Sequence, residues 1–377
     1  MTTAGPGSTG FVYVMSDQDT GNSVTVFNRA TDGGLTKGGT FPTGGLGAGN
    51  SIDSQNDSLT SQGALELSDD RRFLFAVDPG SDEVSVFAIN GDKLELADRV
   101  SSRGIRPISV TSHGNLLYVV NHDGHPNVAG FTVGDDGKLT ALAGEPTPLE
   151  SDNADPAQVG FTSDGTQLVV TEKGTDVIDV FSIDANGHAG FPRKNSSSGR
   201  IPFGFTFATV VGRDLLIVSE LSNAASSYRI EKDGSLTVVS GSVSTEEQGA
   251  CWVVTNSVAD PRFAYVSNAV SGSVSGYRID PTGTLSLLNR DGHTGITRDS
   301  HAALDSAVSS DGRFLYIITA GFNELSDQAV PSNKMTISVF RIEADGNLDT
   351  LPGFGTSDSD PGAPQGLAPG SQGIVAI

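Results

Sequence analysis

The chain has 377 residues, one cysteine and a formal net charge of −22, from 45 acidic and 23 Lys or Arg side chains. This charge opposes binding to nucleic-acid phosphates and anionic lipids, so we expect neither a nucleic-acid nor a membrane partner. A single cysteine excludes an internal disulfide. No apolar run approaches the roughly 18 residues of a transmembrane helix.

The first ten residues, Met1 to Gly10, carry neither the basic start nor the apolar stretch of a secretory signal. We therefore expect a soluble cytoplasmic protein, or a secreted one if a leader has been removed ahead of Met1. We also expect a monomer. We expect no metal or other cofactor, since the sequence contains no HExxH or Cys/His zinc spacing, and the absence of GxSxG leaves a nucleophilic-serine hydrolase unsupported.

Seven short apolar segments of the same cadence recur along the chain. They begin at Phe11, Phe73, Leu116, Leu168, Leu215, Phe263 and Phe314. Their spacing, on the order of 50 residues, is typical of propeller and solenoid repeats. A second strand pattern follows each of them, at residues 24–29, 84–89, 128–133, 177–183, 225–230, 274–279 and 337–342.

Each repeat contains two further strands. A turn and a leucine follow most of the second segments, as in Gly137-Lys138-Leu139. Another strand precedes each first segment and is joined to it by a turn such as Ser163-Asp164-Gly165. Four strands per repeat is the composition of one propeller blade. The sequence therefore predicts an all-β, seven-bladed β-propeller of four-stranded antiparallel blades, with residues 1–377 as one domain.

The two ends of the chain predict how the ring closes. The last seven residues, Ser371 to Ile377, resemble Ser61 to Leu67, which form the predicted inner strand of the second repeat. The N-terminal repeat starts one strand late, at Phe11. We therefore expect the C-terminal strand to complete blade one, which would remove two exposed sheet edges.

Polar side chains stand at the two positions of each blade that face one mouth of the central channel. The seven apolar segments that begin at Phe11 and its counterparts form the second strand of each blade. The residues where these strands end are all polar: Ser16, Asp78, Asn121, Glu172, Glu220, Asn268 and Thr319. The inner strands start at Gln62, Arg106, Gln158, Phe203, Trp252, Asp305 and Gln372, with His301 just upstream of Asp305. Three long insertions fall on this face, and loops of such length are usually functional: residues 44–60, 291–300 and 320–334.

The pattern SxDGRFLYV followed by VSVFRI and DGxL, with VTEKGTDVIDVF and LLIVSEL in blades four and five, resembles the lactonase-type seven-bladed propellers. These are the relatives of 6-phosphogluconolactonase and of the carboxymuconate-cyclising enzymes. The resemblance implies lactone chemistry, with Glu220 matching the family's acidic residue, where a general acid or base is implied. The chain lacks the family's Gly-Pro-Arg-His stretch and has Arg200 to Gly204 (RIPFG) there. A phosphorylated or polycarboxylate substrate is therefore not indicated.

We expect an enzyme that hydrolyses or forms a lactone of a small molecule at the channel mouth. Such a reaction needs an activated water and donors for the oxyanion. Glu220 or His301 is the predicted base, and Arg106, Gln158 and Gln62 are predicted to orient the carbonyl. The remaining predicted contacts with the substrate are Glu172, His122, Trp252, Asp305 and Gln372.

Three alternatives remain open from the sequence. Glu220 and Glu172 are alternatively hydrogen-bond acceptors between blade loops, and Trp252 is alternatively a packing residue. The whole protein is alternatively a non-catalytic propeller that binds a protein or glycan through the same face. A third hypothesis is a metal-assisted lactonase, because the oxygen-bearing side chains at the ends of the second strands are ligands of the kind that calcium takes.

Overall fold

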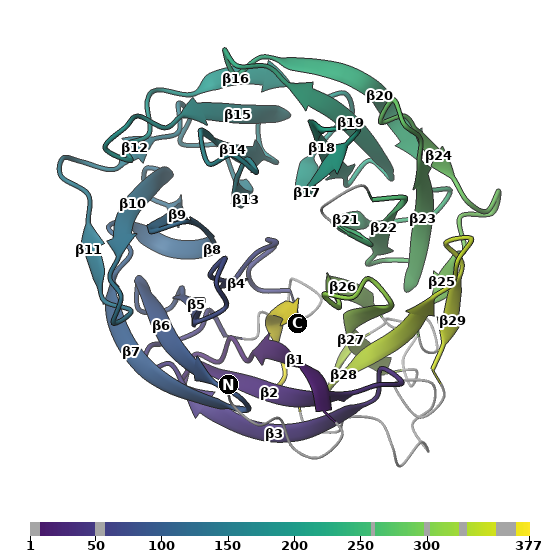
Figure 1. The fold of residues 1–377 in the computed structure, drawn as a ribbon, viewed down its shortest axis with the longest axis horizontal. Coiled ribbons are helices and arrows are strands. Elements are labelled where there is room, and N and C mark those ends of the chain that lie inside the picture. The colour runs from purple at the N-terminus through teal and green to yellow at the C-terminus, as the bar shows by residue number, and fades with distance from the viewer. Residues whose placement is uncertain (1–7, 50–56, 258–260, 298–301, 324–329, 352–366) are drawn as a thin grey trace.

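The computed structural model describes residues 8–49, 57–257, 261–297, 302–323, 330–351 and 367–377. Seven antiparallel sheets stand around one axis, which confirms the predicted seven-bladed propeller (Figure 1). Five sheets have four strands, and those of blades 3 and 6 carry one additional short strand. The described residues contain no helix long and apolar enough to cross a bilayer.

We number the blades in chain order and give their strands from the axis outward. Blade 1 contains β30 (Gln372–Ala376), β1 (Ser8–Met15), β2 (Ser23–Ala30) and β3 (Leu35–Pro42). Blade 2 contains β4 (Leu65–Leu67), β5 (Phe73–Asp78), β6 (Glu83–Asn90) and β7 (Lys93–Ser101). Blade 3 contains β8 (Ile105–His113), β9 (Leu116–Asp123), β10 (Asn127–Val133) and β11 (Leu139–Ala141), with β12 (Thr147–Pro148) also on β10.

The remaining blades follow the same order. Blade 4 contains β13 (Pro156–Phe161), β14 (Gln167–Glu172), β15 (Val177–Ser182) and β16 (Arg193–Ser196). Blade 5 contains β17 (Pro202–Val210), β18 (Arg213–Glu220), β19 (Ala224–Ile230) and β20 (Leu236–Ser244). Blade 6 contains β21 (Ala250–Thr255), β22 (Phe263–Asn268), β23 (Ser273–Ile279) and β24 (Leu285–Leu287), with β25 (Gly295–Ile296) also on β23. Blade 7 contains β26 (Ala302–Val308), β27 (Phe314–Asn323), β28 (Val330–Ile342) and β29 (Leu348–Thr350).

The C-terminal strand closes the ring as predicted. β30 pairs antiparallel with β1, with Val14 opposite Ile374. Two further backbone hydrogen bonds, of 3.0 and 2.8 Å, join Phe11 to Ile377. The side chain of Ile374 is buried in the core cluster that blade 1 shares with blades 6 and 7. The two ends of the chain thus form one sheet.

Buried tyrosines fix the contact between neighbouring blades. The hydroxyl of Tyr118 on β9 donates to the carbonyl of Gly187 in the next blade, at 2.6 Å. Tyr265 makes the same bond to Gly346, and Tyr316 makes it to Gly33, which continues the pattern across the closure. All three glycines have positive φ, a conformation that costs glycine little. An apolar blade surface thereby buries a hydroxyl whose hydrogen bond is satisfied.

A second repeated bond links the blades at the channel mouth. The carboxylate of Asp82, after β5, accepts the backbone N–H of Arg106 at the start of the next inner strand, at 2.7 Å. Asp176 accepts from Ile201 in the same way at 2.6 Å. Arg106 has a φ of +56°, so this bond holds it in an unusual backbone conformation. The hydrogen bond between blades 2 and 3 thereby fixes the direction in which the Arg106 side chain leaves the backbone.

The segment before β4, residues 60–63, crosses the centre of the ring. The Ser61 hydroxyl donates to the carbonyl of Ile108 in blade 3, and the Gln62 N–H donates to Ala157 in blade 4. The Gln62 side chain reaches blade 6, where it donates to the Val253 carbonyl and accepts the Val253 N–H, both at 3.0 Å. This segment therefore separates the mouth from the lower part of the channel.

Deleting Gln372 to Ile377 should cause aggregation or a large loss of melting temperature, because it removes the inner strand of blade 1 and exposes an apolar sheet edge. Ile374→Ala is the matched variant: it keeps the strand and should cost only about 2–5 kcal/mol of unfolding free energy. Differential scanning calorimetry measures both. A truncated protein that melts like the parent would contradict the closure.

Candidate functional site at the channel mouth

The carboxylate predicted as the catalytic base, Glu220, is fully buried. It accepts the backbone N–H of Gly199 at 2.9 Å and the hydroxyls of Ser226 and Ser242. A Cβ on residue 199 would lie 1.8 Å from the Glu220 carboxylate, so this loop fits closely over it. Glu220 therefore binds the strands of blade 5 to the loop from blade 4, and water has no access to it.

The same arrangement recurs at the ends of the other second strands. Asp78, also fully buried, accepts the hydroxyls of Thr43 and Ser85 and the amide of Asn22. The Asn268 amide donates to Ser275 at 2.8 Å. In each case the polar side chain pairs with one that projects from the neighbouring strand of its own blade. The polar ring predicted at the mouth exists, but Asp78, Glu220 and Asn268 hold their blades together.

Blade 4 departs from this pattern because the position of the serine is taken by Asp179. Glu172 and Asp179 are both buried, and neither oxygen of Asp179 has a hydrogen-bond donor among the described residues. The Thr175 hydroxyl donates to Glu172. Burial and the adjacent Glu172 carboxylate raise the pKa of Asp179 to about 8. Glu172 thus faces another carboxyl group and is not exposed at the mouth.

Asp179→Ser should stabilise the protein, because serine supplies the donor that blades 2 and 5 have here. A raised pKa means that the stability contributed by the Asp179 proton is present below pH 4 and is lost as the pH rises to about 8. The gain in melting temperature should therefore be larger at pH 8 than at pH 5. Ser226→Asp is the converse variant and should lower the melting temperature, whereas an Asp179→Ser protein no more stable than the parent at pH 8 would contradict this account.

The residues predicted at the starts of the inner strands have mixed outcomes. Trp252 is fully buried and donates its indole N–H to Ser61 at 2.9 Å, while Gln158 accepts the N–H of Phe205 at 2.6 Å. Trp252 therefore holds the segment of residues 60–63, and Gln158 joins the inner strands of blades 4 and 5. Asp305 and Gln372 are also buried. The pKa of Asp305 is raised to about 8 by burial. His301 lies outside the described residues and stays a prediction.

Arg106 and His122 both approach the Asp123 carboxylate at the mouth. The Arg106 guanidinium donates to the Ser58 carbonyl at 2.6 Å and lies 3.7 Å from the Asp123 carboxylate. The two ring nitrogens of His122 lie 2.6 and 2.8 Å from Asp123 and Asp155. Both side chains are partly exposed, at 31% for Arg106 and 20% for His122. Their carboxylate partners Asp123 and Asp155 are also exposed, at 44% and 45%, so this part of the mouth presents accessible polar groups.

Lys173 lies beneath this pair and is nearly buried. Its ammonium group donates to the carbonyls of Thr60 and Pro156 at 2.8 and 2.9 Å and lies 3.2 Å from Asp155. Burial lowers the pKa of Lys173, and Asp155 partly offsets the effect. Burial alone would raise the pKa of Asp155, but His122 and Lys173 hold it below its usual range. Adjacent strand positions therefore turn Glu172 into the blade and Lys173 toward the axis.

Asp57, which the sequence analysis did not single out, lies at the same mouth, where the positive charges of Lys173 and Arg106 act on it. It is 8% exposed and accepts the N–H of Thr60 at 2.7 Å. Burial raises the pKa of Asp57 to about 6, and Lys173 and Arg106 act against a larger rise. A carboxyl group that titrates near neutrality is suited to general acid–base chemistry. The only signal in the sequence was its place within the long insertion of residues 44–60.

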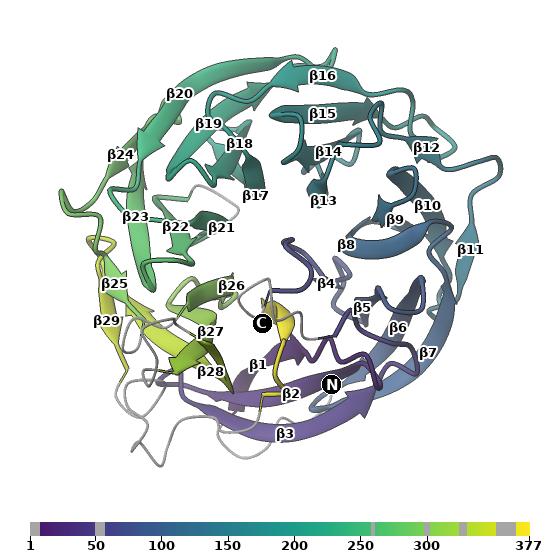
Figure 2. The ribbon, with the colours of Figure 1, turned by 180° about the vertical axis from the view of Figure 1, so that it is seen from behind.

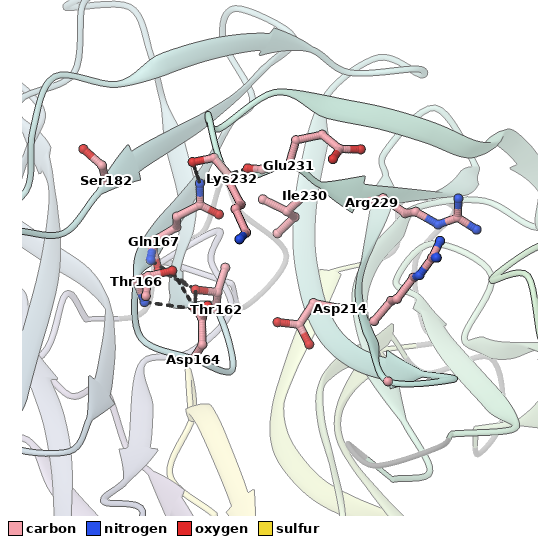
Figure 3. A pocket seen from close by; sticks show the side chains of 12 residues that line it. Thr162, Asp164, Thr166, Gln167, Ser182, Asp214, Arg229, Ile230, Glu231 and Lys232 are labelled. Carbon is pink, nitrogen blue, oxygen red and sulfur yellow. Dashed lines mark hydrogen bonds between the residues drawn. The ribbon is translucent and has the colours of Figure 1, made fainter.

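Two cavities open on the opposite face of the ring. A cleft of about 800 Å³ lies between blades 4 and 5, with Thr166, Gln167 and Lys232 on one side and Asp214 on the other (Figure 3). None of the predicted site residues lines this cleft. A second cavity, of about 610 Å³, lies on the axis and is lined in part by Gln62 and Gln158. Neither cavity contains Asp57, Arg106 or His122.

Fold and sequence together assign the protein to a class. The sequence profile of the family described as "Lactonase, 7-bladed beta-propeller" matches residues 8–149 and 145–255, which is well over half of the chain. The chain therefore belongs to the lactonase family of seven-bladed β-propellers.

Individual relatives within that family are distant. A 6-phosphogluconolactonase of Pectobacterium carotovorum is 24% identical over 309 residues, which cover 77% of this chain and 83% of that protein. The crystal structure of a candidate 6-phosphogluconolactonase from Bacteroides fragilis is 19% identical, covers 98% of both chains and has a TM-score of 0.65. The periplasmic gluconolactonase of Pseudomonas aeruginosa is 20% identical over 91% of this chain and 95% of its own, with a TM-score of 0.61. At these identities the two structures show a shared fold.

Proposed function

We propose that this protein hydrolyses a lactone of a small molecule at the mouth formed by Asp57, Arg106 and His122. The observation that carries the proposal is the carboxyl group of Asp57, which is almost buried, has a pKa raised to about 6 by burial and is subject to the positive charges of Lys173 and Arg106. Membership of the lactonase family supports the reaction class. We do not propose Glu220 as the base, because its oxygens are buried and already accept hydrogen bonds.

The reaction follows from these groups. Asp57 accepts a proton from a water molecule whose oxygen attacks the carbonyl carbon of the lactone. Negative charge develops on the carbonyl oxygen, where the Arg106 guanidinium can donate a hydrogen bond. The ring C–O bond then breaks, and the leaving alkoxide takes the proton back from Asp57. The product is a hydroxy acid whose carboxyl group then releases its proton to solvent, and no covalent intermediate with the protein is formed.

His122, Asp155 and Lys173 are positioning residues in this scheme. The His122 ring lies between Asp123, which also approaches Arg106, and Asp155, which also contacts Lys173. Lys173 in turn holds the Thr60 carbonyl, three residues from Asp57. These contacts connect Arg106 on one side of the proposed site with the Thr60 backbone, near Asp57, on the other. His301, which lies just before β26, remains a second proposed base.

Asp57→Asn should lower kcat by about 10²- to 10⁴-fold, the usual contribution of a general base. The base must be ionised, so kcat/KM of the parent should fall as the pH drops below about 6, after subtraction of spontaneous lactone hydrolysis. The variant should lose that pH dependence and keep its melting temperature, since asparagine removes a poorly solvated charge.

Gluconolactone and a panel of other lactones provide the substrates for this assay. Glu220→Gln is the control: it should lower the melting temperature and leave the activity of the folded fraction and its pH profile unchanged. If a substrate is found and Asp57→Asn keeps parental kcat, the site is wrong. If no lactone is hydrolysed while a ligand still binds at the mouth, the non-catalytic alternative replaces this proposal.

Arg106→Ala should lower kcat/KM by roughly 10- to 100-fold, the loss expected for a charge-assisted hydrogen bond. The larger effect should be on kcat if Arg106 acts on the oxyanion, and on KM if it only anchors the substrate. Arg103→Ala is a matched control, because Arg103 is near in sequence, also has positive φ, and donates to Leu142 and Gly144. Equal kinetics of both variants would exclude a role for Arg106.

A further inference from the structure

The axial cavity of about 610 Å³ has the size of a small-molecule site. It is bounded by residues of blades 2, 3, 4 and 5. The inner strands of these blades, β4, β8, β13 and β17, stand around the axis in Figures 1 and 2. Gln62, whose side chain crosses the ring, lies at the inner end of the cavity. The cavity opens to solvent beside the turns that follow the inner strands. This places it on the opposite side of residues 60–63 from the proposed lactonase site.

Its titratable side chains are Glu66 on β4, Asp69 in the next turn and His113 at the end of β8. No Lys or Arg is among the residues that line it. Within the described part of the chain, the Glu66 carboxylate has no hydrogen-bond donor, whereas Asp69 accepts the N–H of Gly114 at 2.8 Å and lies 3.8 Å from His113. The wall therefore presents a half-buried carboxylate without a compensating cation.

One partly exposed aromatic ring, Phe207 on β17, is among the residues that line the cavity. Phe161 on β13 and Phe205 on β17 also belong to the lining but are almost completely buried, and Phe205 supports Phe207 in an edge-to-face contact at 5.4 Å. Gly160 makes room for them, since a Cβ there would lie 2.7 Å from the Phe205 ring and 3.2 Å from Phe207. Aromatic faces attract a cation that has lost part of its water.

We propose that this cavity binds a small organic cation, of the alkylammonium or quaternary ammonium class, with Glu66 as its counter-ion and the Phe207 ring as part of its apolar wall. An anionic ligand would meet Glu66 and Asp69 without a countercharge. A neutral apolar ligand would leave the Glu66 carboxyl group, in either protonation state, without a hydrogen-bond partner. The ligand class that satisfies the ionised carboxylate and the Phe207 ring together is a cation with an apolar surface.

Binding should depend on pH through Glu66. Burial and the carboxylate of Asp69 raise the pKa of Glu66 to about 8. Near pH 7 most molecules therefore carry a neutral Glu66 and would have to release a proton before the cation binds. Affinity scales with the ionised fraction, so it should be about tenfold tighter at pH 9 than at pH 7. His113 and Asp69 are the other titratable groups that face the cavity.

Isothermal titration calorimetry with choline tests the proposal, because choline keeps its charge at every pH. Its neutral isostere 3,3-dimethylbutan-1-ol has the same shape without the charge. We expect choline to bind with the tenfold pH effect, and the alcohol to bind at least tenfold more weakly at pH 9. Equal binding of the two, or no choline binding at either pH, would overturn the proposal.

Glu66→Gln should remove both the preference for choline and its pH dependence, and it should fold, since it replaces a poorly solvated charge by an amide. Glu95→Gln, at an exposed position of β7 in the same blade, is the matched control and should bind choline like the parent. Asp57→Asn should also keep choline binding, because the two sites lie on opposite sides of residues 60–63. Retained pH dependence in Glu66→Gln would refute the role of Glu66.

Discussion

The antiparallel pairing of β1 with β30 is the joint on which the remaining structure depends. Each blade buries its apolar residues only against its two neighbours, so the ring is complete only when the two ends of the chain meet. Closure also fixes the width of the ring. That width decides whether the Gln62 side chain can reach Val253 in the opposite wall, and hence whether the centre of the molecule is filled.

The buried carboxyl groups of this protein differ in how many hydrogen-bond donors surround them. Asp78 and Glu220 are surrounded by hydroxyl and N–H donors, which keep a carboxylate stable without water. Asp57 and Glu66 have fewer donors, and burial raises the pKa of both. Burial also raises the pKa of Asp78, Asp179 and Asp305. Asp57 and Glu66 are therefore distinguished from the structural acids by their positions, at the mouth and in the axial cavity, and not by the pKa shift alone.

The repeats in the sequence were sufficient to predict the number of blades, the four strands in each and the closing strand, because hydrophobic periodicity is set by the blade itself. Periodicity also located the ring of polar residues that includes Glu220. It could not show that Ser226 and Ser242 donate to Glu220, since such contacts depend on neighbouring strands. Asp57 was missed for a different reason: it lies in an insertion with no counterpart in other blades, so no alignment of repeats could single it out.

The segment of residues 60–63 lies across the axis of the ring and is bonded to the inner strands around it. Its hydrogen bonds to Ile108, Ala157 and Val253 attach it to three different blades, so it is part of the wall and not a loop that swings aside. A polymer could therefore not be threaded along the axis. Whatever reaches Asp57 must enter and leave by the same mouth, which limits its substrates to compact molecules or to the free end of a longer one.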